Sequence, residues 1–407
     1  MSLESAVVEA GAPAGELRLL LPRDDVTAPE ISIVVPALDE ELTIGAFVEW
    51  CQEGLGAAGR PGEVLIVDSS SDATPRIALE KGARVLRTPR RGLGRAYIDA
   101  VPFVRGRYVI MGDCDLTYDF RELRPFVEAL ESGHDFVMGN RLRGAIEPGA
   151  MPALHRYFGT PVTTFALNLI YGTAYGDIHC GMRAMRLETL KRMDLRSQSW
   201  EYASEMVLKA ARMGARIGEV PIRFYKDREG RLSHHKRSGW LSPWRAGWIN
   251  LKSMFLFAPE FFLQKPGGVM LAAGLLLAGS LGGGPYRLFG VGVDLHLMLL
   301  GVTLATVGYG AVQSATLARV FYGFDPAYTE RVARRVTYNR GSLAGLGLGV
   351  IGLLLNLSLL ARWVGGELKL HELQYAAVFG LLLIILGFQT FTFTLLLHMI
   401  LERRERG

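Results

Sequence analysis

The feature that most constrains this chain is a change in composition near Lys265. Charged side chains are frequent before this position and scarce after it, where four long apolar segments follow. These segments cover residues 267–283, 295–317, 343–360 and 373–401. Each approaches or exceeds the roughly 20 residues that a helix needs to cross a bilayer. The sequence therefore predicts a transmembrane domain of four helices over residues 266–407, preceded by a soluble domain.

Basic residues are distributed unevenly around the four apolar segments. The loop between the second and third segments and the C-terminal tail carry most of them: Arg319, Arg331, Arg334, Arg335, Arg340, Arg403, Arg404 and Arg406. The opposite loops hold Arg287, Arg362 and Lys369. Because cytoplasmic loops are enriched in Arg and Lys, we expect a multi-pass protein of the cell (inner) membrane. Its N-terminal domain, middle loop and C-terminus would be cytoplasmic.

Two segments flank the N-terminal domain. Residues 1–30 lack the basic and unbroken apolar regions of a signal peptide, and we expect a poorly ordered leader there. Residues 231–265 combine a basic loop with Trp240, Trp244 and Trp248, which recur every four residues. This spacing favours amphipathic helices lying in the membrane interface; a simple linker into the first span is the alternative.

Charge and cysteine content bear on partners and compartment. The formal net charge is +5, and basic residues beside apolar spans are typical of contact with anionic lipid headgroups. We find no stacked-aromatic or zinc-finger pattern, so the sequence predicts no nucleic-acid partner. Three scattered cysteines, Cys51, Cys114 and Cys180, are too few for a disulfide scaffold or a zinc site and are typical of a reduced compartment.

Between residues 31 and 230, short β-branched runs alternate with longer amphipathic stretches. The predicted strands are residues 31–35, 63–67, 83–87, 107–111 and 135–139, and the predicted helices between them are 45–55, 73–82, 94–104 and 121–132. This alternation predicts an α/β domain with a mostly parallel, Rossmann-like sheet covered on both faces. Ligands of such sheets bind at the carboxyl ends of the strands.

Polar residues gather at four of these strand ends. PALDEE follows the first strand, DSSSDAT the second, DCDLTYD the fourth and GNR the fifth. A single Asp after a strand is more often a helix N-cap, and we expect this of Asp72 and Asp119. Four polar ends at one edge of a sheet nevertheless indicate a pocket.

The pair Asp113 and Asp115 is the sharpest feature of this edge. Two carboxylates one residue apart, leaving a strand, can hold a hard divalent cation such as Mg²⁺ or Mn²⁺ through oxygen ligands. Such a metal would bridge the diphosphate of a nucleotide sugar. NAD chemistry loses support, because Gly92-Leu93-Gly94 lacks the third glycine of a dinucleotide fingerprint. ATP chemistry loses support as well, because the sequence shows no phosphate-binding Gly-x-x-x-x-Gly-Lys-Ser/Thr loop.

The order of these motifs resembles family-2 glycosyltransferases of the GT-A fold, most of all the polyprenyl (dolichyl) phosphate mannose and glucose synthases. The likeness covers about residues 31–267 and is carried by PALDEE, VDSSSDAT, RGLGRA, MGDCDLTYD, MGNRLRG, HRYFGT, GDIHCGMRAMR and SEMVLKAARMGARIGEVPIRFY. It implies a GT-A domain over residues 31–230. It also implies metal-dependent, inverting transfer of a hexose from UDP-glucose or GDP-mannose to polyprenyl phosphate.

The resemblance also implies roles for single residues. The donor nucleotide would be held by Pro36, Ala37, Glu40 and Asp68, and the metal by Asp113 and Asp115 with help from Thr117. The lipid phosphate would be bound by Arg141, Arg156 and Thr160, with Arg141 also counted as catalytic. Asp177, Arg183 and Glu205 match further polar family positions. For the basic stretch with Arg228, Arg231 and His235 two alternatives stay open. It would cover the donor diphosphate or the lipid phosphate, or it would be a solvated loop beside anionic lipid headgroups. His134, His155 and His179 are expected to be surface or core residues.

Two other functions stay open on the sequence. A processive polysaccharide synthase is disfavoured, because Gln198-Ser199-Trp200 lacks the arginine of the Gln-x-x-Arg-Trp motif and no span precedes Ile31. A non-catalytic nucleotide sensor or lipid transporter is disfavoured by the intact Asp-x-Asp and by the few charges inside the spans. Whether copies of the chain form a homo-oligomer is left open.

Overall fold

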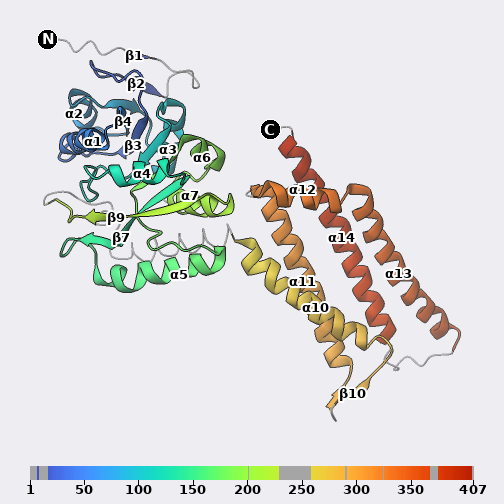
Figure 1. Ribbon diagram of the computed structural model, residues 1–407. Helices are drawn as coiled ribbons and strands as arrows, with labels where there is room; N and C mark the ends of the chain where they lie inside the picture. Colours follow the sequence, from blue (N-terminus) through green and yellow to red (C-terminus); the bar gives the residue numbers. More distant parts are fainter. Residues whose placement is uncertain are drawn as a thin grey trace. The chain divides into compact units, whose positions relative to one another are not determined.

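The computed structural model describes residues 7–8, 17–199, 201–228, 258–288, 291–323, 325–366 and 375–405. The chain divides into two compact units, Met1–Phe257 and Ala258–Gly407, which are labelled by element in Figure 1. The expected interfacial helices with Trp240, Trp244 and Trp248, and the basic positions Arg231 and His235, lie outside the described residues.

The N-terminal unit is built on a nine-stranded sheet of order β1-β2-β5-β4-β3-β6-β8-β7-β9. Its centre is parallel: β3 (Ile31–Ala37) pairs with β4 (Gly62–Asp68) and β6 (Tyr108–Met111), and β4 pairs with β5 (Arg84–Arg87). These four strands lie within three residues of their predicted bounds because their apolar runs are fully buried. The predicted mostly parallel α/β sheet is confirmed.

The other half of the sheet is mixed and was only partly predicted. β8 (Arg183–Arg186) runs antiparallel between β6 and β7 (Phe136–Ile146), and β9 (Ile217–Phe224) runs parallel to β7. No strand was predicted for β8 or β9. β8 has only four residues and carries arginine at both ends, so it shows no apolar run for a sequence pattern to detect.

Two groups of helices pack against the sheet. The first group is α1 (Ile44–Ala58), α2 (Thr74–Glu80) and α4 (Arg124–Glu131), and the second is α3 (Leu93–Ala100), α5 (Thr160–Tyr171), α6 (Leu187–Met193) and α7 (Glu201–Arg212). A short 3-10 helix, Val101–Phe103, follows α3, and a π-helical turn, His155–Gly159, precedes α5. The core between the first group and the sheet includes Phe47, Ile33 and Phe120, all fully buried.

The expected poorly ordered leader is wrong for part of residues 1–30. β2 (Arg18–Leu20) pairs antiparallel with β5 and extends the sheet, and β1 (Val7–Val8) pairs with β2. Leu19 is buried against the sheet, and Asp25 forms two hydrogen bonds of 2.9 Å with the guanidinium of Arg105. Both contacts reach residues far along the chain, so no local pattern announces them.

The C-terminal unit contains the four predicted long apolar helices, which form the candidate membrane spans Glu260–Ser280, Leu295–Tyr322, Tyr338–Val364 and Tyr375–Arg403. The helices are α10 (Lys265–Ser280), α11 (Leu295–Tyr322), α13 (Tyr338–Val364) and α14 (Tyr375–Glu405). The first span starts before residue 266, because a π-helical turn, Glu260–Gln264, runs directly into α10. A short hairpin, β10 (Tyr286–Leu288) and β11 (Val291–Val293), follows α10.

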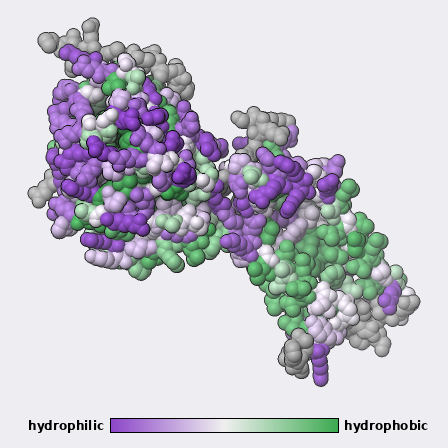
Figure 2. All heavy atoms as spheres, in the orientation of Figure 1, coloured by the Kyte–Doolittle hydropathy of each residue, from purple (hydrophilic) through white to green (hydrophobic). Residues whose placement is uncertain are grey.

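Small residues let these helices approach closely. A Cβ at Gly301 would lie 2.8 Å from the backbone nitrogen of Ala278, and one at Gly345 would lie 2.8 Å from the carbonyl oxygen of Gly387. Close approach of this kind is how helices pack in a bilayer, where lipid removes the hydrophobic drive to associate. The arginine-rich middle loop forms a further helix, α12 (Pro326–Arg335). Figure 2 shows hydrophilic residues over α12 and hydrophobic ones along the long helices.

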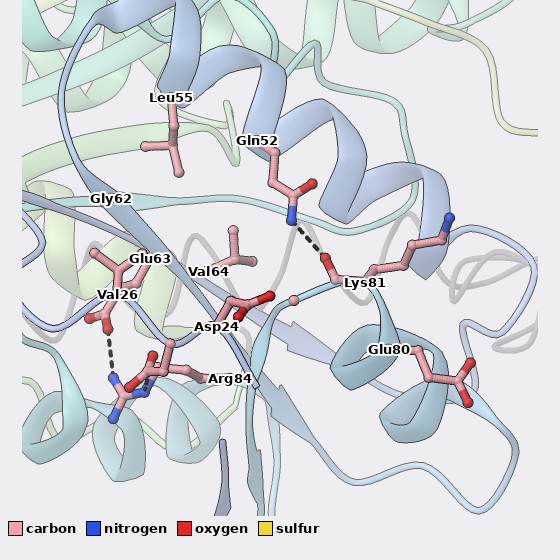
Figure 3. A pocket seen from close by; sticks show the side chains of 12 residues that line it. Asp24, Val26, Gln52, Leu55, Gly62, Glu63, Val64, Glu80, Lys81 and Arg84 are labelled. Atoms are coloured by element: carbon pink, nitrogen blue, oxygen red, sulfur yellow. Dashed lines mark hydrogen bonds and ion pairs between the residues drawn. The ribbon is translucent and has the colours of Figure 1, made fainter. Parts of the chain in front are cut away.

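A buried charge network lies at the amino ends of β4 and β5. The carboxylate of Glu63 accepts hydrogen bonds from the hydroxyl of Ser32 at 2.6 Å, from Arg84 at 2.7 Å and from Arg105 at 2.6 Å. Beside it lies a polar cavity of about 320 Å³ (Figure 3), lined by residues of the loop before β3, of α1, of α2 and of both strands. Because it sits at the amino ends, this cavity is separate from the edge predicted to bind ligands.

Removing the charge of Glu63 should destabilise the N-terminal unit. In Glu63→Gln the Arg84 guanidinium stays buried without its nearest carboxylate, which should cost roughly 3 kcal/mol and lower Tm by on the order of 6–12 °C. Glu80→Gln is the control, because the Arg76–Glu80 pair is exposed and should contribute less than about 1 kcal/mol. Near-UV circular dichroism of the full chain in detergent measures both. Equal shifts would contradict the argument.

Candidate active site

The parallel register brings the polar ends of β3 and β4 together, as predicted, whereas the run Gly139-Asn140-Arg141 that was expected after the fifth strand lies inside β7. Ala37 at the end of β3 lies opposite Asp68 at the end of β4, and Asp68 lies opposite Arg87 at the end of β5. The loop after β6 joins them, because the thiol of Cys114 lies 3.5 Å from the carbonyl oxygen of Pro36. The residues expected at the donor nucleotide and at the metal therefore share one edge of the sheet.

The loop after β3 is held in a strained conformation by the loop after β4. Asp39 has a φ of 55°, a left-handed backbone that non-glycine residues rarely adopt. Its amide donates to the Ser70 hydroxyl at 2.8 Å, and its carboxylate accepts from the Ser71 amide at 3.0 Å. The amide of Glu40, a buried residue, donates to Thr74 at 2.9 Å. Strain that neighbouring contacts over-determine is typical of functional loops.

Asp68 has a partner that the sequence did not predict. Its side chain is fully buried and forms an ion pair with Arg87, whose second nitrogen donates to the carbonyl oxygen of Ser70 at 3.0 Å. A hydrogen-bond donor, the Arg87 guanidinium, and a hydrogen-bond acceptor, the Asp68 carboxylate, therefore lie side by side at this end of the sheet. Arg87 was missed because the pairing depends on the register between β4 and β5, which no local motif encodes.

Asp113 and Asp115 lie in the loop after β6, and both are half-buried. The carboxylate of Asp115 accepts hydrogen bonds from the amide of Thr117 at 3.0 Å and from its hydroxyl at 2.6 Å. Between them Leu116 has a φ of 62°. Thr117 therefore orients Asp115 through its hydroxyl. Gly181 lies against Asp113, since a Cβ there would be 2.8 Å from Oδ2.

These carboxylates fit a divalent cation whose remaining ligands come from a substrate. Within the part of the chain that the structure describes, no group of three or more His, Cys, Asp or Glu side chains could hold a metal. Mg²⁺ commonly binds one or two carboxylates together with substrate phosphates and water rather than a complete protein cage. The chemistry of this pair fits that mode, in which Asp113 and Asp115 would be the protein ligands.

Arg141 and Asp177 form a buried ion pair near this loop. The Arg141 Nε and Nη2 atoms donate to the two oxygens of Asp177 at 2.7 and 2.9 Å, and the Arg141 amide adds a third bond at 3.2 Å. Burial alone would raise the pKa of Asp177, but the hydrogen bonds and charge of Arg141 outweigh it and lower this pKa. The pair stays ionised at neutral pH and holds the guanidinium in one orientation.

α5 separates a polar side from an apolar one. Thr160 is buried, Arg156 is partly buried, and Thr163 lies 2.7 Å from His179 Nε2. On its other side α5 exposes Phe165 by 68%, together with Val162 and Leu169, and the turn before α5 exposes Tyr157 by 73% and Phe158 by 63%, together with the preceding Leu154. Figure 2 shows some hydrophobic residues at the edge of the N-terminal unit where α5 lies. A helix at the surface of a soluble domain normally turns polar side chains outward, whereas here the outward side chains are apolar.

Two expected site residues support loops instead. Arg183 is buried at the start of β8 and donates to the carbonyl oxygens of Cys180 at 3.0 Å and Ala203 at 2.6 Å. Glu205 accepts from the amide of Ser197 at 2.8 Å and pairs with Lys209 at 2.7 Å. Arg228 is exposed at the end of the described segment. These contacts shape the loops that border the site.

Comparison with known families and proteins gives consistent matches. Residues 32–193 match the family described as "Glycosyl transferase family 2". Residues 314–401 match "Glycosyltransferase family 2 C-terminal transmembrane region". The low-salt glycan biosynthesis hexosyltransferase Agl6 of Haloferax volcanii is 35% identical over 379 residues, which is 91% of this chain and 89% of that protein.

Two further proteins are similar over about half of this chain. A dolichyl-phosphate hexose transferase of Haloferax volcanii is 32% identical over 209 residues, covering 51% of this chain and 87% of that protein. Among solved structures, glucosyl-3-phosphoglycerate synthase from Mycobacterium tuberculosis in complex with Mn²⁺ and UDP-glucose superposes with a TM-score of 0.42 and 22% identity. That match covers 56% of this chain and 79% of that chain.

Acidification should destabilise the fold through His179. Burial and the charge of Arg141 lower its pKa from 6.5 to about 4. Between these values the unfolded chain binds the proton and the folded chain does not, so the free energy of unfolding falls as pH falls, by about 3 kcal/mol in total. Tm measured from pH 7 to 4 should therefore fall less steeply in His179→Gln. If Tm fell equally steeply with pH in the wild type and in His179→Gln, the lowered pKa of His179 would be refuted.

Proposed function

Because the chain belongs to glycosyltransferase family 2, we propose that it transfers a hexose from a nucleotide-diphosphate sugar to polyprenyl phosphate. The observation that carries this proposal is the placement of two sites in one unit. The Asp113–Asp115 loop follows β6 at the carboxyl edge of the sheet, and the Arg141–Asp177 pair connects through His179 to Thr163 on α5, a helix with exposed apolar side chains. A charged donor and a lipid acceptor need these two environments side by side.

The donor would bind across the ends of β3 and β4. Pro36, Ala37, Glu40 and Asp68 would contact the base and ribose. Asp113 and Asp115 would hold Mg²⁺ or Mn²⁺, and the bound metal would neutralise charge on the donor diphosphate. The resemblance to both mannose and glucose synthases makes UDP-glucose and GDP-mannose the leading candidates for the sugar donor.

The acceptor phosphate would bind between α5 and the Arg141–Asp177 pair. Guanidinium groups bind phosphate oxygens in pairs of hydrogen bonds, which suits Arg141 and Arg156, and Thr160 can donate from its hydroxyl. The exposed apolar side chains of α5 suit contact with lipid, and a bilayer is always close to a chain with four spans. A relative named for dolichyl phosphate agrees with this choice of acceptor.

The reaction would be one in-line displacement. A phosphate oxygen of the lipid attacks the anomeric carbon, the bond from that carbon to the diphosphate oxygen breaks, and the nucleotide diphosphate leaves with the electron pair. The configuration is thereby inverted. A phosphate monoester has its second pKa near 6, so the acceptor is already anionic and needs no general base. Positioning and charge stabilisation by the residues named above then account for catalysis.

Neutralising either metal-binding carboxylate should abolish transfer. Purified protein is incubated with polyprenyl phosphate, Mg²⁺ or Mn²⁺ and a panel of labelled nucleotide sugars, and label entering the organic phase is counted. Asp113→Asn and Asp115→Asn should each lose at least about 100-fold, while Glu131→Gln, at the exposed end of α4, keeps its activity. Full activity of Asp113→Asn with the metal chelated would remove the metal role, and label that stays in water with every donor would exclude the lipid acceptor.

Orientation in the membrane can be tested with single cysteines. The native Cys51, Cys114 and Cys180 are buried, so they give little background. In right-side-out vesicles an impermeant maleimide should label Arg287→Cys at once, and Arg331→Cys only after permeabilisation. This result would place α12 and the N-terminal unit in the cytoplasm. The reverse labelling pattern would contradict the proposed cytoplasmic orientation.

A further inference from the structure

We infer that His179 is a positioning residue that links α5 to the phosphate-binding guanidinium of Arg141, so that contact of α5 with lipid sets the geometry of the acceptor site. This inference rests on the proposed function. It assigns a role to a histidine that the sequence suggested was an ordinary surface or core residue.

Three consecutive contacts make the link. His179 Nε2 lies 2.7 Å from the hydroxyl of Thr163 on α5. The His179 amide donates to Asp177 Oδ1 at 3.2 Å. The same oxygen accepts from Arg141 Nη2 at 2.9 Å. A displacement of α5 therefore reaches the guanidinium through one carboxylate.

The contacts of Thr163 favour one tautomer of the imidazole. Two carbonyl oxygens lie within reach of the Thr163 hydroxyl, that of Gly159 at 2.7 Å and that of Thr160 at 3.1 Å. When the hydroxyl donates to either of them, its oxygen accepts from His179, so that Nε2 carries the proton and Nδ1 has the lone pair. The low pKa of about 4 keeps the ring neutral in this tautomer at physiological pH. His179 therefore transmits position without contributing a charge that would compete with Arg141 for the phosphate.

A second bond reinforces the connection between α5 and this loop. The amide of Ile178 lies 3.5 Å from the hydroxyl of Thr164, which is buried on the inner side of α5. The loop from Asp177 to His179 is thus attached to α5 at two points. α5 in turn packs on α7 and on the turn His155–Gly159. With its outer face apolar, α5 is suited to respond to lipid and to carry the loop with it.

The test separates positioning from simple packing. His179→Leu and Thr163→Val remove the contact between His179 and Thr163, and Thr163→Val does so without changing any charge. His179→Gln keeps the contact, because the glutamine amide can donate to Thr163 in place of the imidazole. Thr173→Val is the matched control, because Thr173 bonds Asn168 at the far end of the same helix. Each protein is assayed with a long-chain polyprenyl phosphate in lipid vesicles and with a short-chain, water-soluble prenyl phosphate.

We expect KM for the long-chain acceptor to rise about tenfold in His179→Leu and Thr163→Val, with KM for the donor unchanged. The defect should be smaller for the short-chain acceptor, and His179→Gln and Thr173→Val should resemble the wild type. Should His179→Leu fail to fold, Thr163→Val carries the test. An unchanged acceptor KM, a raised donor KM, or equal losses on both acceptors would overturn the inference. A wild-type protein inactive on both acceptors would instead refute the proposed function.

Discussion

The parallel pairing of β3 with β4 and β6 determines where chemistry can take place in the N-terminal unit. Because the three strands run in one direction, everything that follows them meets at one edge, and everything that precedes them meets at the other. The amino edge carries the buried Glu63 network and the polar cavity, with every charge of the network used in holding the strands. The carboxyl edge carries the Asp113–Asp115 loop, at the end of the sheet where ligands of such folds bind. The charged residues of the Glu63 network and those of the candidate active site therefore lie at opposite edges of the same sheet.

The part of this arrangement that the sequence predicts is the part with local signals. Apolar β-branched runs located β3, β4, β5 and β6, and polar residues immediately after three of these runs placed the strand-end loops. Four apolar segments located the four long helices of the C-terminal unit, because helix length and hydrophobicity suffice to identify a span. The pair Asp113 and Asp115 needed only its position after a buried strand to be singled out.

What the sequence could not predict depends on contacts between distant residues. Arg87 reaches Asp68 only because β4 and β5 align in a particular register. β8 is too short and too polar to show a strand pattern, yet it turns half of the sheet from parallel to mixed. Arg183 and Glu205 were singled out as tentative site residues, and the structure shows both buried, with contacts to backbone groups at Cys180 and Ser197. A motif gives the identity of such residues, while the tertiary structure decides what they contact.

Electrostatics explains why the acceptor side needs more than Arg141. Its charge is already balanced by Asp177, so the pair supplies direction to a phosphate but little net attraction. Arg156 lies in the turn that leads into α5 and is partly buried, and a metal at Asp113 and Asp115 would add further positive charge. An anionic lipid would then be drawn by Arg156 and the metal, and oriented by Arg141. In this proposal, residues of α5 and of the turn before it would attract the lipid phosphate, and Arg141 on the sheet would align it. The connection between α5 and Arg141 through His179 would keep these two parts of the acceptor site in register.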